Sequence, residues 1–271
     1  MANEVARTQR TPMDKLKNVL NTESVKAQFQ NALKENAGAF IASIIDLYGS
    51  DKHLQECDPN AVIMEALKAA TLKLPINKQL GFAYIVPYRS KGVAIPQFQL
   101  GYKGYIQLAM RTGQYRFLNA GVIYEGVKVH RNILTGEITF SGEPTSEKAQ
   151  GYFAYMELLN GFSKTVYMTK EEVIKHAQRY SKSYNTANSA WKSNFDEMAM
   201  KTVTRMLLSK YGILSTDMIS ALTSDRDEDI EGAVEREIAS EANQEVIDIT
   251  TQVKPEEEEQ PEAASSGGPG F

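Results

Sequence analysis

YFAYMELLNGFSKTVYMTKEE, residues 152–172, places two strands and the start of a helix in one short stretch. Residues typical of strands flank Asn160-Gly161, a pair that is a strong signal for a hairpin turn. Thr169 and Glu172 then have the spacing of a capping box, which predicts that a helix begins directly after the hairpin. An antiparallel hairpin joined to a helix indicates the α+β class.

A second hairpin is predicted upstream, in residues 81–100. Apolar residues alternate along its first half, residues 89–92 have the composition of a turn, and the second half returns as another strand. Pro87 and Pro96 lie within the two arms, and proline in a strand favours an edge position because it cannot donate a ladder hydrogen bond. We therefore expect this hairpin to project from the sheet.

The remaining elements fit the same class. Spacing and turn residues predict further strands at residues 116–124, 127–133 and 137–140, and helices at 23–48, 59–74, 101–112, 169–184 and 194–211. The predicted fold is an antiparallel meander with a projecting hairpin, packed with helices from both ends of the chain.

Charge divides the chain unevenly. Residues 1–222 carry 27 Lys and Arg against 19 Asp and Glu, whereas residues 223–271 carry 3 against 15, which together give the net charge of −4. A basic body is typical of a polyanion partner, and a short acidic segment poor in aromatic residues is typical of a solvated tail. We expect a mobile basic arm at residues 1–22, a folded domain that binds a polyanion at 23–222, and an acidic disordered tail at 223–271.

Several classes of protein are disfavoured. The single cysteine, Cys57, excludes an intramolecular disulfide and suits a reducing cytosol, and no apolar stretch is long enough to span a bilayer. No P-loop motif occurs, which disfavours an ATP-driven recombinase. His53, His130 and His176 fit no metal spacing. We expect a cytoplasmic protein that is not an enzyme, with no catalytic residue, metal site, cofactor or membrane contact.

Three of the predicted helices carry basic residues away from their apolar faces. A single such stripe is more often only a solvated face, but residues 173–211 contain seven Lys and Arg against Asp196 and Glu197 alone. Repeated like charges are more easily explained if an anion relieves them. The stripes consist of Lys103, Gln107 and Arg111, then Lys175, Arg179 and Lys182, then Lys201 and Arg205.

The segment between the last two helices, residues 181–193, combines hydroxyl, amide and aromatic side chains. Such residues donate to phosphates without base preference, and aromatic rings stack on unpaired bases. The candidates are Asn185, Asn188, Trp191 and Lys192. Trp191 serves equally well as a core anchor, and the sequence leaves both readings open.

Two stretches resemble the RecT family of phage single-strand DNA annealing proteins, in particular those from phages of Gram-positive bacteria. They are QFQLGYKGYIQLAMR at residues 97–111 and WKSNFDEMAMKTVTR at residues 191–205. The resemblance covers roughly residues 30–215. It implies a core like that of annealing proteins of the Rad52 type. It also implies that the protein coats single-stranded DNA without ATP and anneals complementary strands as a ring or filament.

The resemblance also implies partners and site residues. The partners are single-stranded DNA, the annealed duplex intermediate, further copies of the chain, a phage 5′→3′ exonuclease and the host single-strand-binding protein. The groove positions that it implies are Lys103, Arg111, Arg179, Lys182, Asn185, Asn188, Lys192, Lys201 and Arg205. A passive nucleic-acid coat protein, a metal-dependent nuclease and an assembly module without nucleic acid remain alternatives. The tail is either a docking or regulatory segment or a solubilising one.

Overall fold

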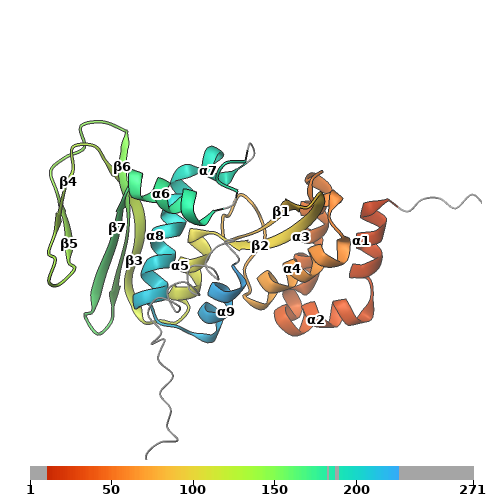
Figure 1. Cartoon of the computed structure of the whole chain (residues 1–271). Helices are drawn as coiled ribbons and strands as arrows, with labels where there is room; N and C mark the ends of the chain where they lie inside the picture. Colours follow the sequence, from red (N-terminus) through yellow and green to blue (C-terminus); the bar gives the residue numbers. More distant parts are fainter. Residues whose placement is uncertain (1–10, 182, 187–188, 226–271) are drawn as a thin grey trace, which may run out of the picture.

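The computed structural model describes residues 11–181, 183–186 and 189–225. The molecule is elongated, with helices from the N-terminal part of the chain at one end and a group of strands at the other (Figure 1). Mixed helices and antiparallel strands confirm the predicted α+β class.

The helical end is built from the first part of the described chain. Leu16, Phe29, Ile44 and Val62 come from four successive helices and are fully buried in one apolar core. Asp58 caps the fourth helix by accepting from Ala61 N, as its sequence predicted. The elements are α1 (Pro12–Leu20), α2 (Glu23–Leu33), η1 (Lys34–Asn36), α3 (Ala37–Ser50), η2 (Leu54–Glu56) and α4 (Pro59–Thr71).

The prediction of a mobile arm at residues 1–22 is wrong for the part from Thr11 onward. Thr11 and Asp14 form a capping box that opens α1. Leu16 and Leu20 lie one turn apart on the same face of α1 and are 0% and 2% exposed, so burial of apolar surface holds this helix on the core. Residues 1–10 lie outside the described residues.

The first hairpin consists of β1 (Ala83–Ser90) and β2 (Val93–Leu100). Lys91 and Gly92 both have positive φ, as a two-residue hairpin turn requires. The base of the hairpin packs on α4, where the Phe98 N–H donates to Glu65 at 2.7 Å. Only the region around the turn is exposed, so the hairpin projects at its tip rather than along its length.

The other strands form two separate sheets rather than one continuous meander. One sheet has the order β3-β6-β7. The segment of chain that connects β3 to β6 forms a separate two-stranded hairpin of β4 and β5. The Asn160-Gly161 turn joins β6 to β7 as predicted, with Gly161 at positive φ. The strands are β3 (Tyr115–Tyr124), β4 (Lys128–Arg131), β5 (Ile138–Ser141), β6 (Ala149–Leu158) and β7 (Ser163–Thr169).

Helices that follow the first hairpin connect the two ends of the molecule. The capping box of Thr169 opens α6 (Lys170–Tyr180), which ends earlier than predicted. The long helix α8 buries Leu207 against the β3-β6-β7 sheet and Leu208 in the helical core, so it joins the two apolar cores. The helices are α5 (Tyr102–Met110), α6 (Lys170–Tyr180), α7 (Ala190–Ser193), α8 (Phe195–Tyr211) and α9 (Thr216–Ser224).

Helix α9 was not predicted, and it moves the end of the folded body past residue 222. Its buried Met218 and Ala221 pack into the helical core, and the next residue after the helix, Asp225, is also buried. The predicted disordered tail at residues 223–271 is therefore wrong for residues 223–225, and residues 226–271 lie outside the described residues.

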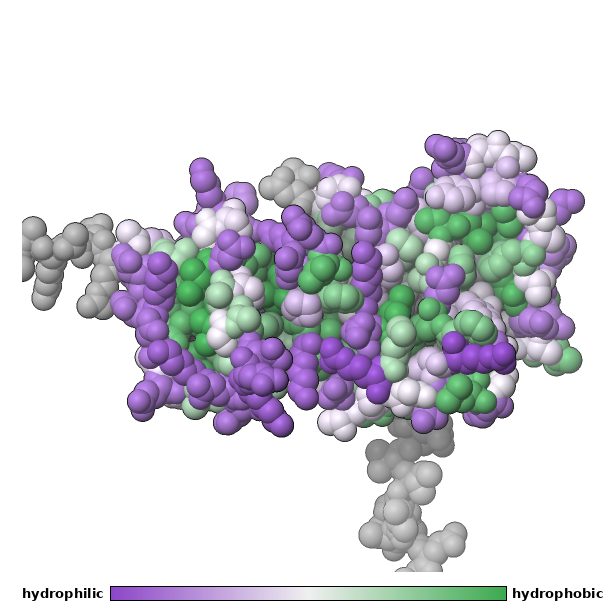
Figure 2. All heavy atoms as spheres, turned by 180° about the vertical axis from the view of Figure 1, so that it is seen from behind, coloured by the Kyte–Doolittle hydropathy of each residue, from purple (hydrophilic) through white to green (hydrophobic). Residues whose placement is uncertain are grey.

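The surface of the described part is polar with scattered apolar patches, as the rear view in Figure 2 shows. Large apolar side chains that reach solvent include Met64, Phe117, Ile133 and Leu134. No helix in this part of the chain has the length and apolar character needed to cross a membrane.

Candidate nucleic-acid interface

A cleft of about 470 Å³ lies where the β1–β2 hairpin, the start of α5, and helices α7 and α8 meet. Lys78, Lys103 and Lys201 line it together with the rings of Tyr84 and Tyr102. The described lining also includes Gln79, Gly81, Val86, Gln99, Leu100, Gly101, Ala190, Asn194, Glu197 and Met198. Cations beside aromatic rings are the combination that single-stranded nucleic acid requires.

A close backbone approach positions α5 beside this cleft. Gly101 precedes the helix, and a Cβ atom there would lie 2.1 Å from the carbonyl oxygen of Gly81. The Gly101 N–H also donates to the Phe82 carbonyl at 2.9 Å. Only glycine fits at this contact, so the sequence places Tyr102 and Lys103 at the mouth of the cleft.

The three lysines of the cleft differ in their surroundings. Lys103 is exposed, and its ammonium lies 6.0 Å from the centre of the Tyr102 ring. Lys78 forms an ion pair of 2.8 Å with Asp51, and its side chain is 53% exposed. Lys201 forms an ion pair of 3.2 Å with Asp225 and is buried. Lys103 is therefore the cleft lysine that an incoming phosphate reaches most readily.

The phenol of Tyr84 is a neutral hydrogen-bond donor within the cleft. Burial raises its pKa above the ordinary value, and the nearby carboxylate of Glu197 raises it further. The ammonium of Lys201 opposes this shift without reversing it. A protonated phenol can donate to a phosphate or present its ring to a base.

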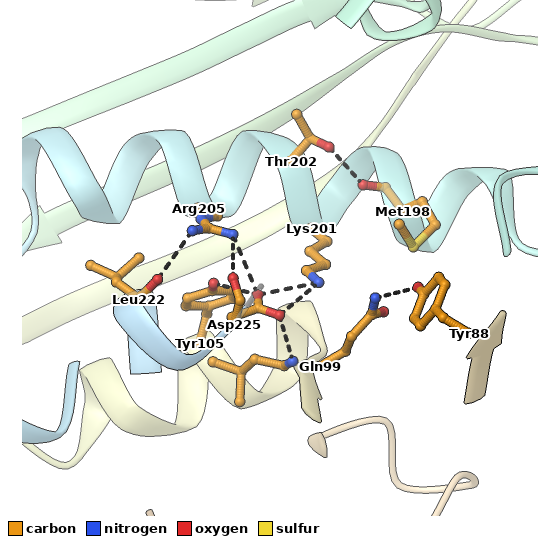
Figure 3. A network of polar contacts seen from close by, with 10 residues as sticks. Tyr88, Gln99, Tyr105, Met198, Lys201, Thr202, Arg205, Leu222 and Asp225 are labelled. Carbon is orange, nitrogen blue, oxygen red and sulfur yellow. Dashed lines mark hydrogen bonds and ion pairs between the residues drawn. The ribbon is translucent and has the colours of Figure 1, made fainter. Parts of the chain in front are cut away.

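Lys201 and Arg205 lie away from the apolar face of α8, but other parts of the protein cover them. Their side chains are 5% and 10% exposed, because α9 and Asp225 cover that side of α8 (Figure 3). Arg205 also donates to the main-chain oxygens of Leu222 and Asp225, at 3.1 and 3.2 Å. Both cations belong to a buried polar network in this arrangement.

Trp191 is a core residue, which answers the question that its sequence left open. Its side chain is 6% exposed and belongs to the apolar core under α8. The ring lies between Tyr184 and Phe195, with centroid distances of 6.0 and 5.6 Å in edge-on geometry. A ring enclosed in this way cannot stack on a base, so the reading of Trp191 as a core anchor fits the structure and the stacking reading does not.

Arg111 is exposed but already has acceptors. Its guanidinium donates to the main-chain oxygens of Leu72 and Lys73, at 2.6 and 2.9 Å, where α4 ends. These carbonyls lack partners within the helix, so Arg111 stabilises the end of α4. A structural role accounts for this side chain without DNA.

The other predicted residues are distributed over α5, α6, α7 and the segment that connects α6 to α7. Lys175, Arg179, Asn185 and Lys192 are exposed, and Gln107 is half-buried. The Arg179 guanidinium lies 5.2 Å from the centre of the Tyr180 ring. Lys192 belongs to α7, whose first residue lines the cleft. Lys182 and Asn188 lie outside the described residues, and a DNA contact by any of these seven side chains stays a prediction.

Sequence reasoning did not nominate several polar residues that line the cleft, among them Lys78, Tyr84, Tyr102 and Asn194. Tyr102 is adjacent to Lys103 in the stretch that carries the family resemblance, which was a usable signal. Lys78 lies in a connecting segment whose position depends on tertiary packing, and no local pattern indicates it.

The described residues offer no metal or nucleophilic site. No group of three or more His, Cys, Asp or Glu side chains that could hold a metal ion occurs among them. The buried thiol of Cys57 has a pKa raised to about 11, first by burial and then by the charges of Glu56 and Asp51. A thiol with that pKa is protonated at neutral pH and is a poor nucleophile.

Comparison of the sequence with known families defines its class, the single-strand annealing proteins of recombination. The model of the RecT family matches residues 38–245, and the chain belongs to that family. The resemblance read from residues 97–111 and 191–205 is thereby confirmed.

Two relatives show how far the similarity extends. The chain is 50% identical over 208 residues to the uncharacterized protein YqaK of Bacillus subtilis strain 168, covering 76% of this chain and 70% of YqaK. It is 30% identical over 181 residues to Protein RecT of Escherichia coli K12, covering 65% of this chain and 66% of that protein.

Proposed function

We propose that the protein binds single-stranded DNA without ATP and anneals complementary strands as an oligomer, with the strand held in the cleft between the β1–β2 hairpin, α5, α7 and α8. The observation that carries the proposal is the convergence of Lys78, Lys103 and Lys201 with Tyr84 and Tyr102 around one opening. These side chains come from separate segments of the residues that the family model matches.

The chemistry of annealing asks little else of the protein. Two complementary strands repel each other through their phosphates, and lysine side chains reduce that repulsion so that the bases can test their register. Base pairing itself reads the sequence, so the cleft needs no base-specific contacts. Tyr84 and Tyr102 supply ring faces and hydroxyl donors, which suit any base.

Oligomerisation is supported by the turn between β4 and β5. Ile133 and Leu134 are both 94% exposed there, and neighbouring apolar side chains at an exposed tip are typical of protein contacts. We propose that this turn contacts a second copy of the chain. The double substitution Ile133→Ser and Leu134→Ser should lower the mass of the oligomer in light scattering, whereas an unchanged mass would exclude this turn as the contact.

Annealing is tested with two complementary labelled oligonucleotides and no nucleotide cofactor. The proposal predicts faster duplex formation with protein, with strands of unchanged length on a denaturing gel when Mg²⁺ is present. Shortened strands would indicate a nuclease. Binding that does not accelerate duplex formation would indicate a passive coat protein. Absence of salt-dependent binding would indicate an assembly module.

Partners and location complete the proposal. We place the action of the protein in the cytoplasm of a bacterial host, beside a phage 5′→3′ exonuclease and the host single-strand-binding protein. Removing residues 226–271 tests whether this segment serves annealing itself or the docking of a partner protein. Unchanged annealing by the purified protein with lost recombination in cells would support a docking tail, and unchanged recombination would support a solubilising one.

A further inference from the structure

Asp225 occupies a site whose donors would suit a phosphate equally well. The Leu100 N–H donates to Oδ1 at 3.0 Å, and the Tyr105 hydroxyl donates to Oδ2 at 2.6 Å. The ammonium of Lys201 lies 3.2 Å from the carboxylate, and the guanidinium of Arg205 lies 3.6 Å from Oδ2. Cations and backbone N–H groups that converge in this way bind carboxylates and phosphates alike.

The donors and the acceptor come from different parts of the fold. Leu100, Tyr105, Lys201 and Arg205 belong to β2, α5 and α8, whereas Asp225 follows the short helix α9 (Figure 3). The site is therefore complete in the body of the protein, and the anion arrives on a separate segment. Asp225 directly follows the last turn of α9, so withdrawal of its carboxylate requires only this turn to move, while the buried Ala221 can stay in the core.

The charged groups at this site are deeply buried. The side chains of Lys201, Arg205 and Asp225 are 5%, 10% and 0% exposed. Charges held this far from solvent need opposite charges beside them. An anion that takes the place of Asp225 therefore has to carry a comparable charge.

The site also adjoins the cleft proposed for DNA. Leu100 and Lys201 line that cleft and contact Asp225 at the same time. A phosphodiester that enters the cleft therefore comes next to the donors that Asp225 occupies.

We infer that Asp225 closes a phosphodiester site: its carboxylate occupies Lys201 and Arg205 in the free protein, and a backbone phosphate of single-stranded DNA replaces it in the complex. The inference rests on the proposed function. The exchange trades one singly charged oxyanion for another, so the two cations stay neutralised to the same extent. Withdrawal of Asp225 is the cost of binding, and it lowers the affinity of the resting protein.

The first test is Asp225→Asn, which removes the charge and keeps the size of the side chain. We expect tighter binding to a single-stranded oligonucleotide. The slope of log affinity against log salt should stay close to that of the parent, because the same cations meet phosphate in both complexes. Asp217→Asn is the matched control, because Asp217 is an exposed carboxylate in the first turn of α9.

Two results of this test bear on the inference in opposite ways. Tighter binding by Asp225→Asn than by Asp217→Asn, which is lost when Lys201→Gln is added in the double variant, supports the exchange. A folded Asp225→Asn protein that binds no more tightly than Asp217→Asn overturns it, because Asp225 then does not compete with DNA.

The second test uses the unmodified protein and does not depend on the variant folding. The Asp225 N–H donates to the Ala221 carbonyl, and the Ile219 N–H donates to the Ser215 carbonyl, both at 2.9 Å. When single-stranded DNA is added, hydrogen exchange at Asp225 should accelerate relative to Ile219. Unchanged or slower exchange in a protein that binds DNA overturns the inference alone, whereas absence of DNA binding would refute the proposed function.

Discussion

The hydroxyl of Tyr105 on α5 donates to the carboxylate of Asp225 at 2.6 Å, which joins two residues 120 positions apart. Both groups are buried, and the same carboxylate accepts from Leu100 N and Lys201. The network fixes the end of α9 against α5 and α8 (Figure 3). It therefore contributes to the stability of the body as well as to the charge of the cleft.

Arg205→Ala should destabilise the protein by about 3–5 kcal/mol, the usual result of breaking a buried ion pair. The substitution leaves the main-chain oxygens of Leu222 and Asp225 without their guanidinium donor. Urea unfolding measures the change. The control is Lys175→Ala, which alters an exposed side chain of α6 and should leave the free energy of unfolding within about 0.5 kcal/mol of the parent's. A loss as small as that of the control would mean that the network does not hold α9.

Leu16→Ala should cost about 2–5 kcal/mol of unfolding free energy, because the side chain is fully buried in the helical core. Lys15→Ala next to it changes an exposed side chain and should have little effect. Denaturant unfolding of the two variants compares them directly. Equal stabilities would restore the view that α1 belongs to a mobile arm.

Trp191→Ala should cost about 3–5 kcal/mol, since it empties the space between Tyr184 and Phe195. Trp191 is the only tryptophan of the chain, so its fluorescence reports this site alone. Iodide should quench the emission weakly, with or without single-stranded DNA. Strong quenching that DNA suppresses would show that the ring is at the interface.

Asp51 provides a prediction about pH. Burial raises the pKa of its carboxyl, but hydrogen bonds from Lys78 and from the N–H groups of Leu54 and His53 outweigh burial and lower the pKa. A lowered folded pKa stabilises the protein fully above the unfolded value of about 3.9, and this stabilisation disappears as the pH falls through the folded pKa. The difference in stability between the parent and Asp51→Asn should therefore shrink from pH 6 towards pH 2. A constant difference would contradict this.

Local sequence was sufficient for the elements whose signals are local. The Asn160-Gly161 turn and the capping box of Thr169 and Glu172 are formed as predicted, because each depends on residues a few positions apart. The α+β class follows from the order of such elements. The separation of the strands into three sheets depends on packing between distant segments, and no short-range pattern indicates it.

The candidate site was predicted less completely, and Lys201 and Arg205 show why. A helical projection correctly puts them away from the apolar face of α8, but it cannot show that α9 covers their side. Ser215, with Met218 and Ala221 at helical spacing, was the local signal for α9. The contacts of Asp225, which follows α9, with Lys201 and Arg205 depend on tertiary packing, which only the structure reveals.

The central claim is that the cleft beside α5 binds single-stranded DNA, and the salt dependence of binding by Lys103→Ala tests it most directly. Lys26→Ala, which changes an exposed lysine of α2 at the helical end, is the matched control. Lys103→Ala should weaken binding to random-sequence strands and reduce the slope of log affinity against log salt by about 0.7, while Lys26→Ala leaves the slope unchanged. A folded Lys103→Ala protein with the parent's slope and affinity would contradict the account.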